Sequence, residues 1–312
     1  MESLLLSFRA VAPIFLLMLL GYLLRCTKVA TKDHFNAINR LIFKVFLPIL
    51  LFYNIYKTDL QMVFDLKLIL FVVVSVLAVY GIGYGLVFLL TKPNNKRSVM
   101  LQGFFRSNFA ILGIPLVDYL CGDAAGGLAS LMVAIVVPLF NVLAVITFER
   151  FRGGKVKPGA LVKGIVTNPL IIGCALGALF LLAGIPLPQF LESAVDDAAS
   201  IASPLAIVAL GASFNFSAIK GSLKELTVTV LTRLVIVPAL AVAAAVALGF
   251  RGEALICLMV AFGAPAAVSS FSMAQQMGGD EDLAAQVVVF SSALCLLTLF
   301  GWIFLLSSLG LF

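Results

Sequence analysis

Ten long apolar stretches divide this sequence, and they constrain its fold more than any single motif does. Each holds roughly 20 mostly uncharged residues, which is the length that an α-helix needs to cross a bilayer. Across the chain 62% of residues are hydrophobic and only 12% are charged, more apolar than the core of a soluble domain requires. The stretches cover residues 4–24, 34–56, 66–90, 98–120, 125–148, 159–183, 191–213, 223–249, 253–277 and 283–310. We therefore predict an all-α integral membrane protein whose ten transmembrane helices lie in a lipid bilayer.

Basic residues gather in alternate connections between these stretches. The odd-numbered connections hold thirteen of them: Arg25, Lys28, Lys32, Lys92, Lys96, Arg97, Arg150, Arg152, Lys155, Lys157, Lys163, Lys220 and Lys224. The even-numbered connections hold only Lys57, Lys67 and Arg251. Cytoplasmic connections of membrane proteins carry an excess of Lys and Arg. We therefore expect the odd-numbered connections in the cytoplasm, beneath a bacterial inner membrane, and both termini on the extracytoplasmic side.

Several classes of chemistry lack the residues that they need. His34 is the only histidine, the five cysteines form no CxxC pair, and no Walker A, GxGxxG or HExxH sequence occurs. No constellation of His, Asp and Glu falls at one depth of the predicted helices. We therefore expect no metal, no cofactor, no nucleic-acid partner and no enzymatic activity, and an ATP-driven pump would need another subunit.

Proline positions indicate an internal repeat around the polar connection of residues 149–163. The matched positions are Pro13 with Pro169, Pro48 with Pro204, and Gly113-Ile114-Pro115 with Gly263-Ala264-Pro265. Each half, residues 1–150 and residues 151–312, holds five stretches, and this odd number makes the second half enter the membrane from the opposite side. The pattern predicts an inverted repeat, which is the build of many secondary transporters. Chance is the alternative explanation, because Gly and Pro are common in membrane helices.

The fourth stretch contains FRSNFAILGIPLV at residues 105–117, and these letters predict a broken helix. Proline removes an amide donor and glycine adds backbone freedom, so we expect a break between about Asn108 and Pro115. A matching break is expected around Gly263 and Pro265. Two broken helices that cross would offer half-helix N-termini to an anion and carbonyl ends to a cation. This crossing is the predicted binding site.

Polar side chains near the two breaks supply the candidate site residues. Arg106 would either neutralise an anion in a cavity or reach the lipid headgroups. Asn108 would either bond a substrate carboxylate or cap the second half-helix. The predicted substrate-binding residues are Arg106, Asn108, Gly113, Ile114, Pro115, Gly263, Ala264, Pro265, Ser269 and Ser270, with Asp118 as a candidate coupling residue and no metal ligand.

Two further polar residues within the stretches leave their roles open. Arg233 would be a second cavity cation or a partner for the stretch that carries Asp196 and Asp197, although that pairing joins distant depths. Asn141 follows Pro138, and it would either line the cavity or relieve a kink.

Four segments resemble the auxin efflux carrier family, which includes the plant PIN exporters and prokaryotic dicarboxylate permeases. They are FLPILLF at residues 46–52, SNFAILGIPL at 107–116, TNPLIIG at 167–173 and SPLAIVALGASF at 203–214. The resemblance covers nearly the whole chain, and its most specific element is Asn108 followed by Gly-Ile-Pro. It implies ten helices in two inverted five-helix repeats, with a scaffold of helices one, two, six and seven. It further implies a transport domain of helices three to five and eight to ten, a proline-based crossover at Pro265, and a homodimer formed through the scaffold.

Two departures from the plant pattern favour a compact prokaryotic permease. Leu258 lies seven residues before Pro265, whereas Asn108 lies seven before Pro115, and the central connection is only about fifteen residues long. The resemblance implies a secondary carrier of small organic anions that works by alternating access, with malate-like or malonate-like dicarboxylates favoured over auxin. Coupling to a proton or to sodium stays open. Few acids are buried in the stretches, and a proton could travel on the substrate itself.

Other functions share parts of this pattern. A sodium-coupled bile-acid-type symporter or a cation/proton antiporter could have the same ten-helix inverted fold, but an antiporter would be expected to place acidic residues at the crossing. A membrane sensor that does not transport is a further alternative. A sensor normally needs an output domain, and no polar stretch here exceeds about twenty residues.

Overall fold

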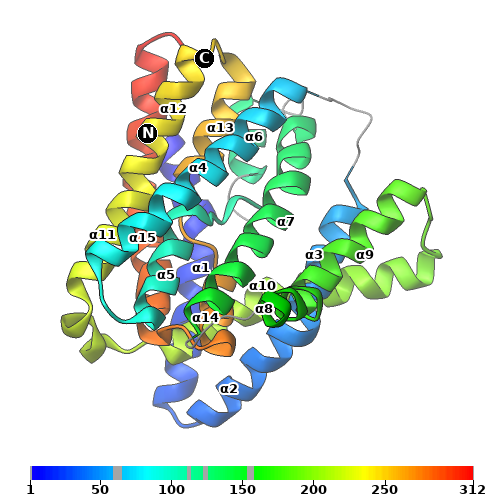
Figure 1. The fold of residues 1–312 in the computed structure, drawn as a ribbon, viewed down its shortest axis with the longest axis vertical. Helices are drawn as coiled ribbons and strands as arrows, with labels where there is room; N and C mark the ends of the chain where they lie inside the picture. The colour runs from blue at the N-terminus through cyan, green and yellow to red at the C-terminus, as the bar shows by residue number, and fades with distance from the viewer. Residues whose placement is uncertain (1, 59–64, 111–113, 122–125, 153–157, 312) are drawn as a thin grey trace.

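The computed structural model describes residues 2–58, 65–110, 114–121, 126–152 and 158–311. Within these ranges the regular structure is helical and no strand occurs. Six helical segments are long and apolar enough to cross a membrane by length and composition: Lys32–Tyr56, Leu66–Leu90, Leu128–Phe151, Gln189–Ser213, Leu223–Ala247 and Glu281–Ser308. The predicted all-helical class is therefore confirmed, and these six segments are consistent with an integral membrane protein (Figure 1).

Helices lie over each of the apolar stretches, and three stretches are interrupted between two helices, two of them where a break was predicted. In chain order the helices are α1 (Glu2–Cys26), α2 (Lys32–Leu41), α3 (Leu47–Tyr56), α4 (Leu66–Leu90), α5 (Asn94–Phe105), α6 (Ile114–Cys121), α7 (Gly126–Phe151), α8 (Pro158–Val166), α9 (Pro169–Ala183), α10 (Gln189–Ser213), α11 (Leu223–Leu231), α12 (Val237–Ala247), α13 (Gly252–Gly263), α14 (Ser269–Met277) and α15 (Glu281–Ser308). The divided stretches are residues 98–120, 159–183 and 253–277.

The division between α8 and α9 was not predicted, and it follows from the Asn168-Pro169 pair. A residue before proline is driven out of the α region, so a continuous helix is disfavoured there. Asn168 has extended backbone angles, and its side chain accepts a hydrogen bond from the Leu170 amide at 2.9 Å. The asparagine is therefore the N-cap of a new helix, with proline at its first position.

Prolines also explain two π-helical turns that join otherwise continuous helices. The turns are Ile42–Phe46, between α2 and α3, and Thr232–Ile236, between α11 and α12. Pro48 and Pro238 follow these turns by two residues, and each leaves the carbonyl four residues earlier without its helical donor. For Pro238 that carbonyl belongs to Leu234, and the Trp302 indole donates to it at 3.4 Å.

Glycines let two helix pairs approach closely. α1 packs along α10, and α3 packs along α9. A Cβ atom on Gly211 of α10 would lie 2.0 Å from the carbonyl oxygen of Met18, and one on Gly21 of α1 would lie 1.9 Å from that of Val208. Gly173 of α9 faces the backbone of α3 in the same way. Such small residues are typical of close helix contacts within membranes.

Two of the interrupted stretches, residues 98–120 and 253–277, meet each other where their helices end. The α5 helix ends at Phe105 and α6 begins at Ile114, while α13 ends at Gly263 and α14 begins at Ser269. Between them, Ser107 and Ala266 form an isolated antiparallel bridge, and the Asn108 amide donates to the Pro265 carbonyl at 2.8 Å. In Figure 1, α6 and α13 lie in the upper half, with α5 and α14 in the lower half. The crossing expected from the Gly and Pro residues is thus present, although it begins at Arg106 rather than Asn108.

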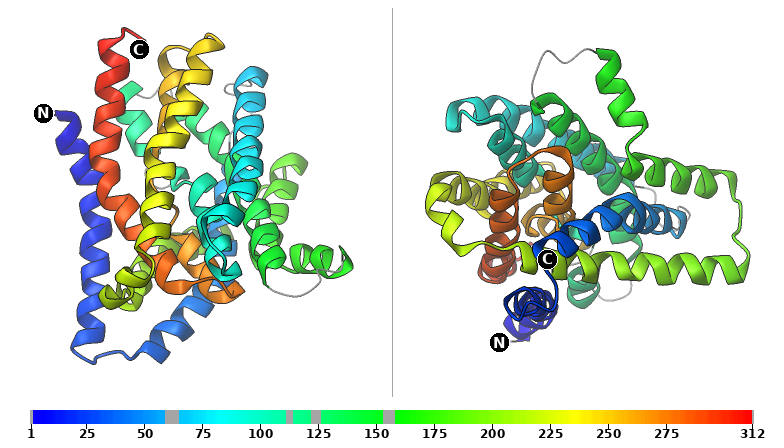
Figure 2. Two further views of the ribbon diagram at one scale, coloured as in Figure 1. Left: turned by 60° about the vertical axis from the view of Figure 1, so that its left-hand side comes forward. Right: turned by 90° about the horizontal axis from the view of Figure 1, so that it is seen from below.

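The basic connections gather at one end of the molecule. Residues 27–31, 91–93 and 214–222 lie in the lower half in Figure 1, whereas residues 248–251 lie at the upper end. The first turns of α1 and the last turns of α15 also lie in the upper part of the left view in Figure 2. The charge asymmetry of the sequence is therefore an asymmetry between two ends of the structure.

Candidate functional site

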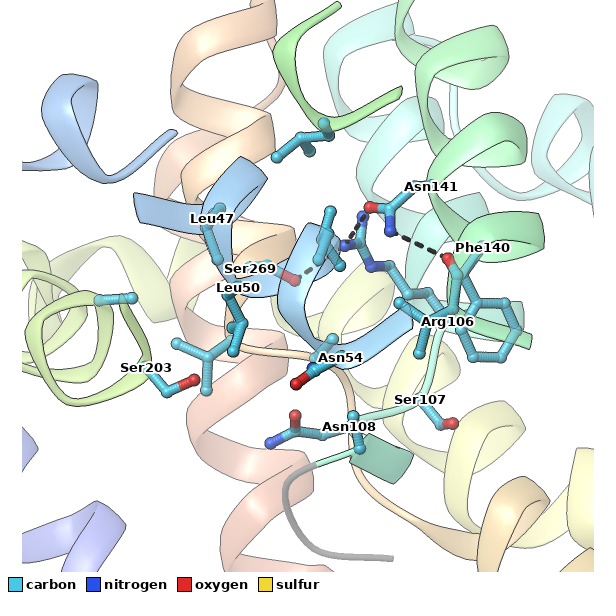
Figure 3. Close-up of a pocket in the computed structure, with 17 residues that line it drawn as sticks. Leu47, Leu50, Asn54, Arg106, Ser107, Asn108, Phe140, Asn141, Ser203 and Ser269 are labelled. Atoms are coloured by element: carbon cyan, nitrogen blue, oxygen red, sulfur yellow. Dashed lines mark hydrogen bonds between the residues drawn. The ribbon is translucent and has the colours of Figure 1, made fainter. Parts of the chain in front are cut away.

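A cavity of about 190 Å³ lies beside the crossing, and residues of several helices line it. Its polar lining residues are Asn54, Arg106, Ser107, Asn108, Asn141, Ser203 and Ser269 (Figure 3). The apolar part of the wall comes from residues such as Leu47, Leu50, Phe140 and Leu170. The arrangement is a mostly apolar cavity with a few convergent polar groups, which is typical of small-molecule sites.

The four segments that carry the family resemblance all reach this cavity. Residues 46–52 contribute Leu47, Leu50 and Leu51; residues 107–116 contribute Ser107, Asn108 and Ala110; residues 167–173 contribute Leu170; and residues 203–214 contribute Ser203 and Ala206. These segments are far apart in the sequence, and the fold brings them together around one small volume.

Arg106 is the cation of the cavity wall. The residue is only 4% exposed, and its Nη2 atom donates to Asn141 Oδ1 and to Ser269 Oγ, each at 2.8 Å. Its Nη1 atom contacts the sulfur of Met273. In the described part of the chain no carboxylate pairs with it, since the four ion pairs there join other residues. Arg106 therefore does not reach the lipid headgroups, which was the alternative prediction, because its guanidinium is buried against neutral side chains.

Asn108 faces the cavity with an unused donor. Its backbone is held by the bond to Pro265, while its side-chain Nδ2 atom is buried and has no hydrogen-bond partner within the described ranges. In Figure 3 the Asn108 and Asn54 side chains both reach into the cavity. A buried donor without a partner is costly, so this amide is suited to an acceptor supplied by a ligand.

Of the two roles that the sequence left open for Asn141, the structure shows the one at the cavity wall. Its Oδ1 atom accepts from Arg106, and its Nδ2 atom donates to the Val137 carbonyl at 2.9 Å, next to Pro138. The residue is fully buried on α7, and it lines the cavity. It therefore fixes the orientation of the Arg106 guanidinium.

The remaining predicted residues divide into several groups. Ser269 lines the cavity, whereas Gly263, Ala264, Pro265 and Ser270 are absent from its wall as far as the chain is described. A Cβ atom on Gly263 would lie 3.0 Å from Leu299, so this glycine admits a side chain of α15. Ile114, Pro115 and Asp118 belong to α6, but their side chains lie outside the described part, and Gly113 lies outside it altogether.

Asn54 and Ser203 line the cavity and were missed from the sequence. The sequence held a local feature that could have marked each residue. Ser203 directly precedes Pro204, and Asn54 is a lone amide in an apolar helix. Both signals are common in membrane helices, and only the packing of α3 and α10 brings them to the crossing.

A neighbouring cavity lies beside the end of α3. A second cavity of about 170 Å³ shares Asn54 and Ala110 with the first and reaches Lys57 and Thr58 at the end of α3. At this end Lys57 Nζ lies 2.6 Å from Glu192 Oε1, and this hydrogen bond raises the pKa of Lys57 above its usual value.

A polar cluster joins α2 to α14 at the opposite end. Ser272 and Gln275 hydrogen-bond to the buried Asn39 side chain. Gln275 also donates to Asn36 at 3.0 Å and to Glu281 at 2.9 Å. We call Asn36, Asn39, Ser272, Gln275 and Glu281 the α2–α14 cluster. The described residues contain no group of three or more His, Cys, Asp or Glu side chains that could hold a metal ion.

Comparisons with known proteins agree with this membrane architecture. A family model described as "Membrane transport protein" matches residues 6–160 and 155–303. The chain is 25% identical over 297 residues to an "Uncharacterized transporter" of Methanothermobacter thermautotrophicus, which covers 95% of this chain and 97% of the relative. It is 22% identical over 295 residues to the "Uncharacterized transporter YfdV" of Escherichia coli, with 89% and 92% covered. A "Putative malonate transporter" of Rhizobium meliloti is 26% identical over 310 residues, with 96% and 95% covered.

The family match spans nearly the whole chain, and the relatives align along almost their full lengths. This confirms the resemblance seen in the four segments around the cavity. The chain belongs to the membrane transport protein family, the family of the auxin efflux carriers.

Proposed function

We propose that this protein is a secondary carrier of small organic anions, with mono- or dicarboxylates such as malonate or malate as substrates. The observation that carries the proposal is Arg106, a buried cation at the cavity wall without a carboxylate partner in the described chain. Removing such a charge from water is costly unless it is paired. A substrate carboxylate would supply the missing negative charge.

Other groups at the crossing would orient that carboxylate. Ser269 is the first residue of α14, and a helix N-terminus carries a partial positive charge of roughly +0.5. The unpaired Asn108 amide would donate a further hydrogen bond. Gly113, Ile114 and Pro115, around the start of α6, remain predicted substrate-binding residues, and Asp118 remains a predicted coupling residue.

The size of the cavity favours a small acid. Pockets for drug-sized ligands have volumes of about 300–1,000 Å³, and this cavity has about 190 Å³. Asn54 and Ser203 could take a second carboxylate or a hydroxyl group of the substrate. The relative from Rhizobium meliloti bears the name of a malonate transporter, and malonate falls within this class.

The proposal includes the arrangement of the chain in the membrane. Residues 1–150 and 151–312 would each form five crossings, as two inverted repeats. The matched close contacts of α1 with α10 and of α3 with α9 support a scaffold made of the first two predicted helices of each half. The positions of the basic connections support both termini on the extracytoplasmic side of a bacterial inner membrane, and we further propose a homodimer through the scaffold.

Alternating access would open and close two passages, one toward each end of the molecule. The second cavity, which shares Asn54 and Ala110 with the first, reaches Lys57 at the end proposed to face outside, and the α2–α14 cluster joins the helices at the other end. Transport would require the crossing and its helices to shift against the scaffold, so that the outer passage closes and the cluster separates.

The test is uptake of labelled malonate, malate and an indole carboxylate by purified protein in proteoliposomes. We expect saturable uptake of malonate or malate. We also expect Arg106→Gln to lower uptake about tenfold or more, since a charged hydrogen bond contributes about 1.5–3 kcal/mol. Asn108→Ala should raise KM. Arg40→Gln, which removes an exposed arginine from α2, serves as the matched control and should leave uptake unchanged.

Two outcomes would contradict the proposal. If the folded wild-type protein moves no anion, the cavity binds without transport, as in a sensor. If Arg106→Gln transports as the wild type does, the anion is bound elsewhere in the molecule.

A further inference from the structure

Arg233 is fully buried, and it does not line the described cavity. Its guanidinium makes five hydrogen bonds, all to backbone carbonyl oxygens. Nε donates to Ala264 at 2.9 Å, Nη1 to Phe104 and Phe105 at 3.2 Å each, and Nη2 to Ala261 at 3.2 Å and Phe262 at 2.7 Å. Every acceptor lies at the end of α5 or of α13, where these helices stop before the crossing.

These carbonyls are the groups that a broken helix leaves without partners. The last four carbonyls of an α-helix have no donor within the helix. Each helix C-terminus carries a partial charge of roughly −0.5, so two such ends together carry about −1, which balances one guanidinium. Both roles that the sequence suggested for Arg233 are therefore wrong. It is not a cavity cation, and it pairs with neither Asp196 nor Asp197 in the described structure.

The position of Arg233 also matters for the cavity, because its partners adjoin residues that line it. Phe105 directly precedes Arg106, and Ala264 directly precedes Pro265, whose carbonyl holds Asn108. By binding both helix ends at once, the guanidinium fixes the spacing of the two segments between the helices, of which one carries Arg106 and Asn108 and the other leads into Ser269. Lysine could not do the same, because its ammonium has only three donors and no planar fork.

We propose that Arg233 is a positioning residue that acts as a resident cation at the crossing. It takes the place in which carbonyl ends of broken helices coordinate a coupling Na⁺ ion in other transporters. The carrier therefore needs no exchangeable cation there, and anion uptake is independent of Na⁺. This inference rests on the proposed carrier function.

The first test is chemical rescue. Arg233→Ala removes the guanidinium and leaves a space at the two helix ends. We expect malonate uptake to fall about tenfold or more, corresponding to about 1.4 kcal/mol per factor of ten, chiefly through a higher KM. Millimolar guanidinium should restore uptake in this variant and leave the wild type unchanged. Arg233→Lys should stay impaired, and Arg40→Ala, which alters an exposed arginine, should show neither the loss nor the rescue.

Two results of this experiment would overturn the inference. Uptake by Arg233→Ala at the wild-type level would mean that no cation is needed. A loss that guanidinium does not restore, in protein that elutes as a folded species, would leave Arg233 with a packing role alone.

The second test uses the unmodified protein, in case Arg233→Ala does not fold. Uptake of malonate is compared with Na⁺ and with choline in its place, and with and without an inward Na⁺ gradient. Equal rates are expected, and Na⁺-driven accumulation would overturn the inference.

A third readout keeps this inference separate from the proposed function. If the wild type moves no anion at all, the carrier proposal fails. Thermal unfolding of Arg233→Ala in detergent still decides the role of Arg233, since guanidinium should raise the Tm of this variant and not that of Arg233→Lys. An unchanged Tm would overturn the inference.

Discussion

Two buried arginines at the crossing differ in what surrounds them. Arg233 is enclosed by five backbone carbonyls that together balance its charge, whereas Arg106 contacts the neutral side chains of Asn141 and Ser269. Hydrogen bonds to an amide and a hydroxyl orient a guanidinium without neutralising it. The charge of Arg106 is thus available to a ligand, and the charge of Arg233 is not.

A single substitution tests this distinction at the residue scale. Asn141→Asp keeps nearly the same shape and places a carboxylate where Oδ1 lies 2.8 Å from Arg106 Nη2. We expect this internal ion pair to compete with the substrate and to raise the KM for malonate about tenfold or more, a change of about 1.4 kcal/mol per factor of ten. Asn141→Ala removes the hydrogen bond without adding a charge, so its KM should rise less. Equal KM values for the two variants would contradict the expectation.

At the scale of elements, the lengths of the apolar stretches and the positions of the prolines predicted the helices and two of their breaks. The features that the sequence missed depend on how the helices pack. The sequence predicted the stretches over α1, α4 and α10 within a few residues, because about twenty apolar residues have few alternatives in a membrane. The breaks near Pro115 and Pro265 followed from local chemistry. Asn54, Ser203 and the partners of Arg233 did not, because each depends on which distant helix lies alongside. The α8–α9 division at Asn168 was readable in principle, since Asn-Pro is a local signal.

The close contact between α1 and α10 gives a prediction at the element scale. Gly211→Ala would place a methyl group where 2.0 Å separates it from the Met18 carbonyl oxygen, so the two helices must move apart. We expect a loss of about 1–3 kcal/mol in the free energy of unfolding, the usual range for overpacking. Thermal unfolding of the detergent-solubilised protein measures it. Gly85→Ala on α4, where nothing lies within 4 Å of the added atom, is the control and should unfold as the wild type does.

At the scale of the whole molecule, the second cavity at the end of α3 and the α2–α14 cluster lie on either side of the crossing. Asn39 belongs to α2 and Ser272 to α14, and these two helices would separate under alternating access. A covalent bond between them should therefore hold one state.

Cysteines at positions 39 and 272, in a background without the five native cysteines, test that expectation. Oxidation of Asn39→Cys/Ser272→Cys should block malonate uptake, and a reducing agent should restore it. Each single-cysteine variant should transport under both conditions. Full uptake by the cross-linked protein would show that α2 and α14 stay together during transport.

The unpaired charge of Arg106 also has an electrical consequence for the proposed carrier. An empty site would hold one positive charge, and a bound monocarboxylate would bring the site to neutrality. The membrane potential would then act on the return of the empty protein and not on the loaded step. A fully ionised dicarboxylate would leave the loaded site with one negative charge. Voltage would then act on both halves of the cycle and in the same sense, because a negative charge that moves inward and a positive charge that moves outward carry the same current.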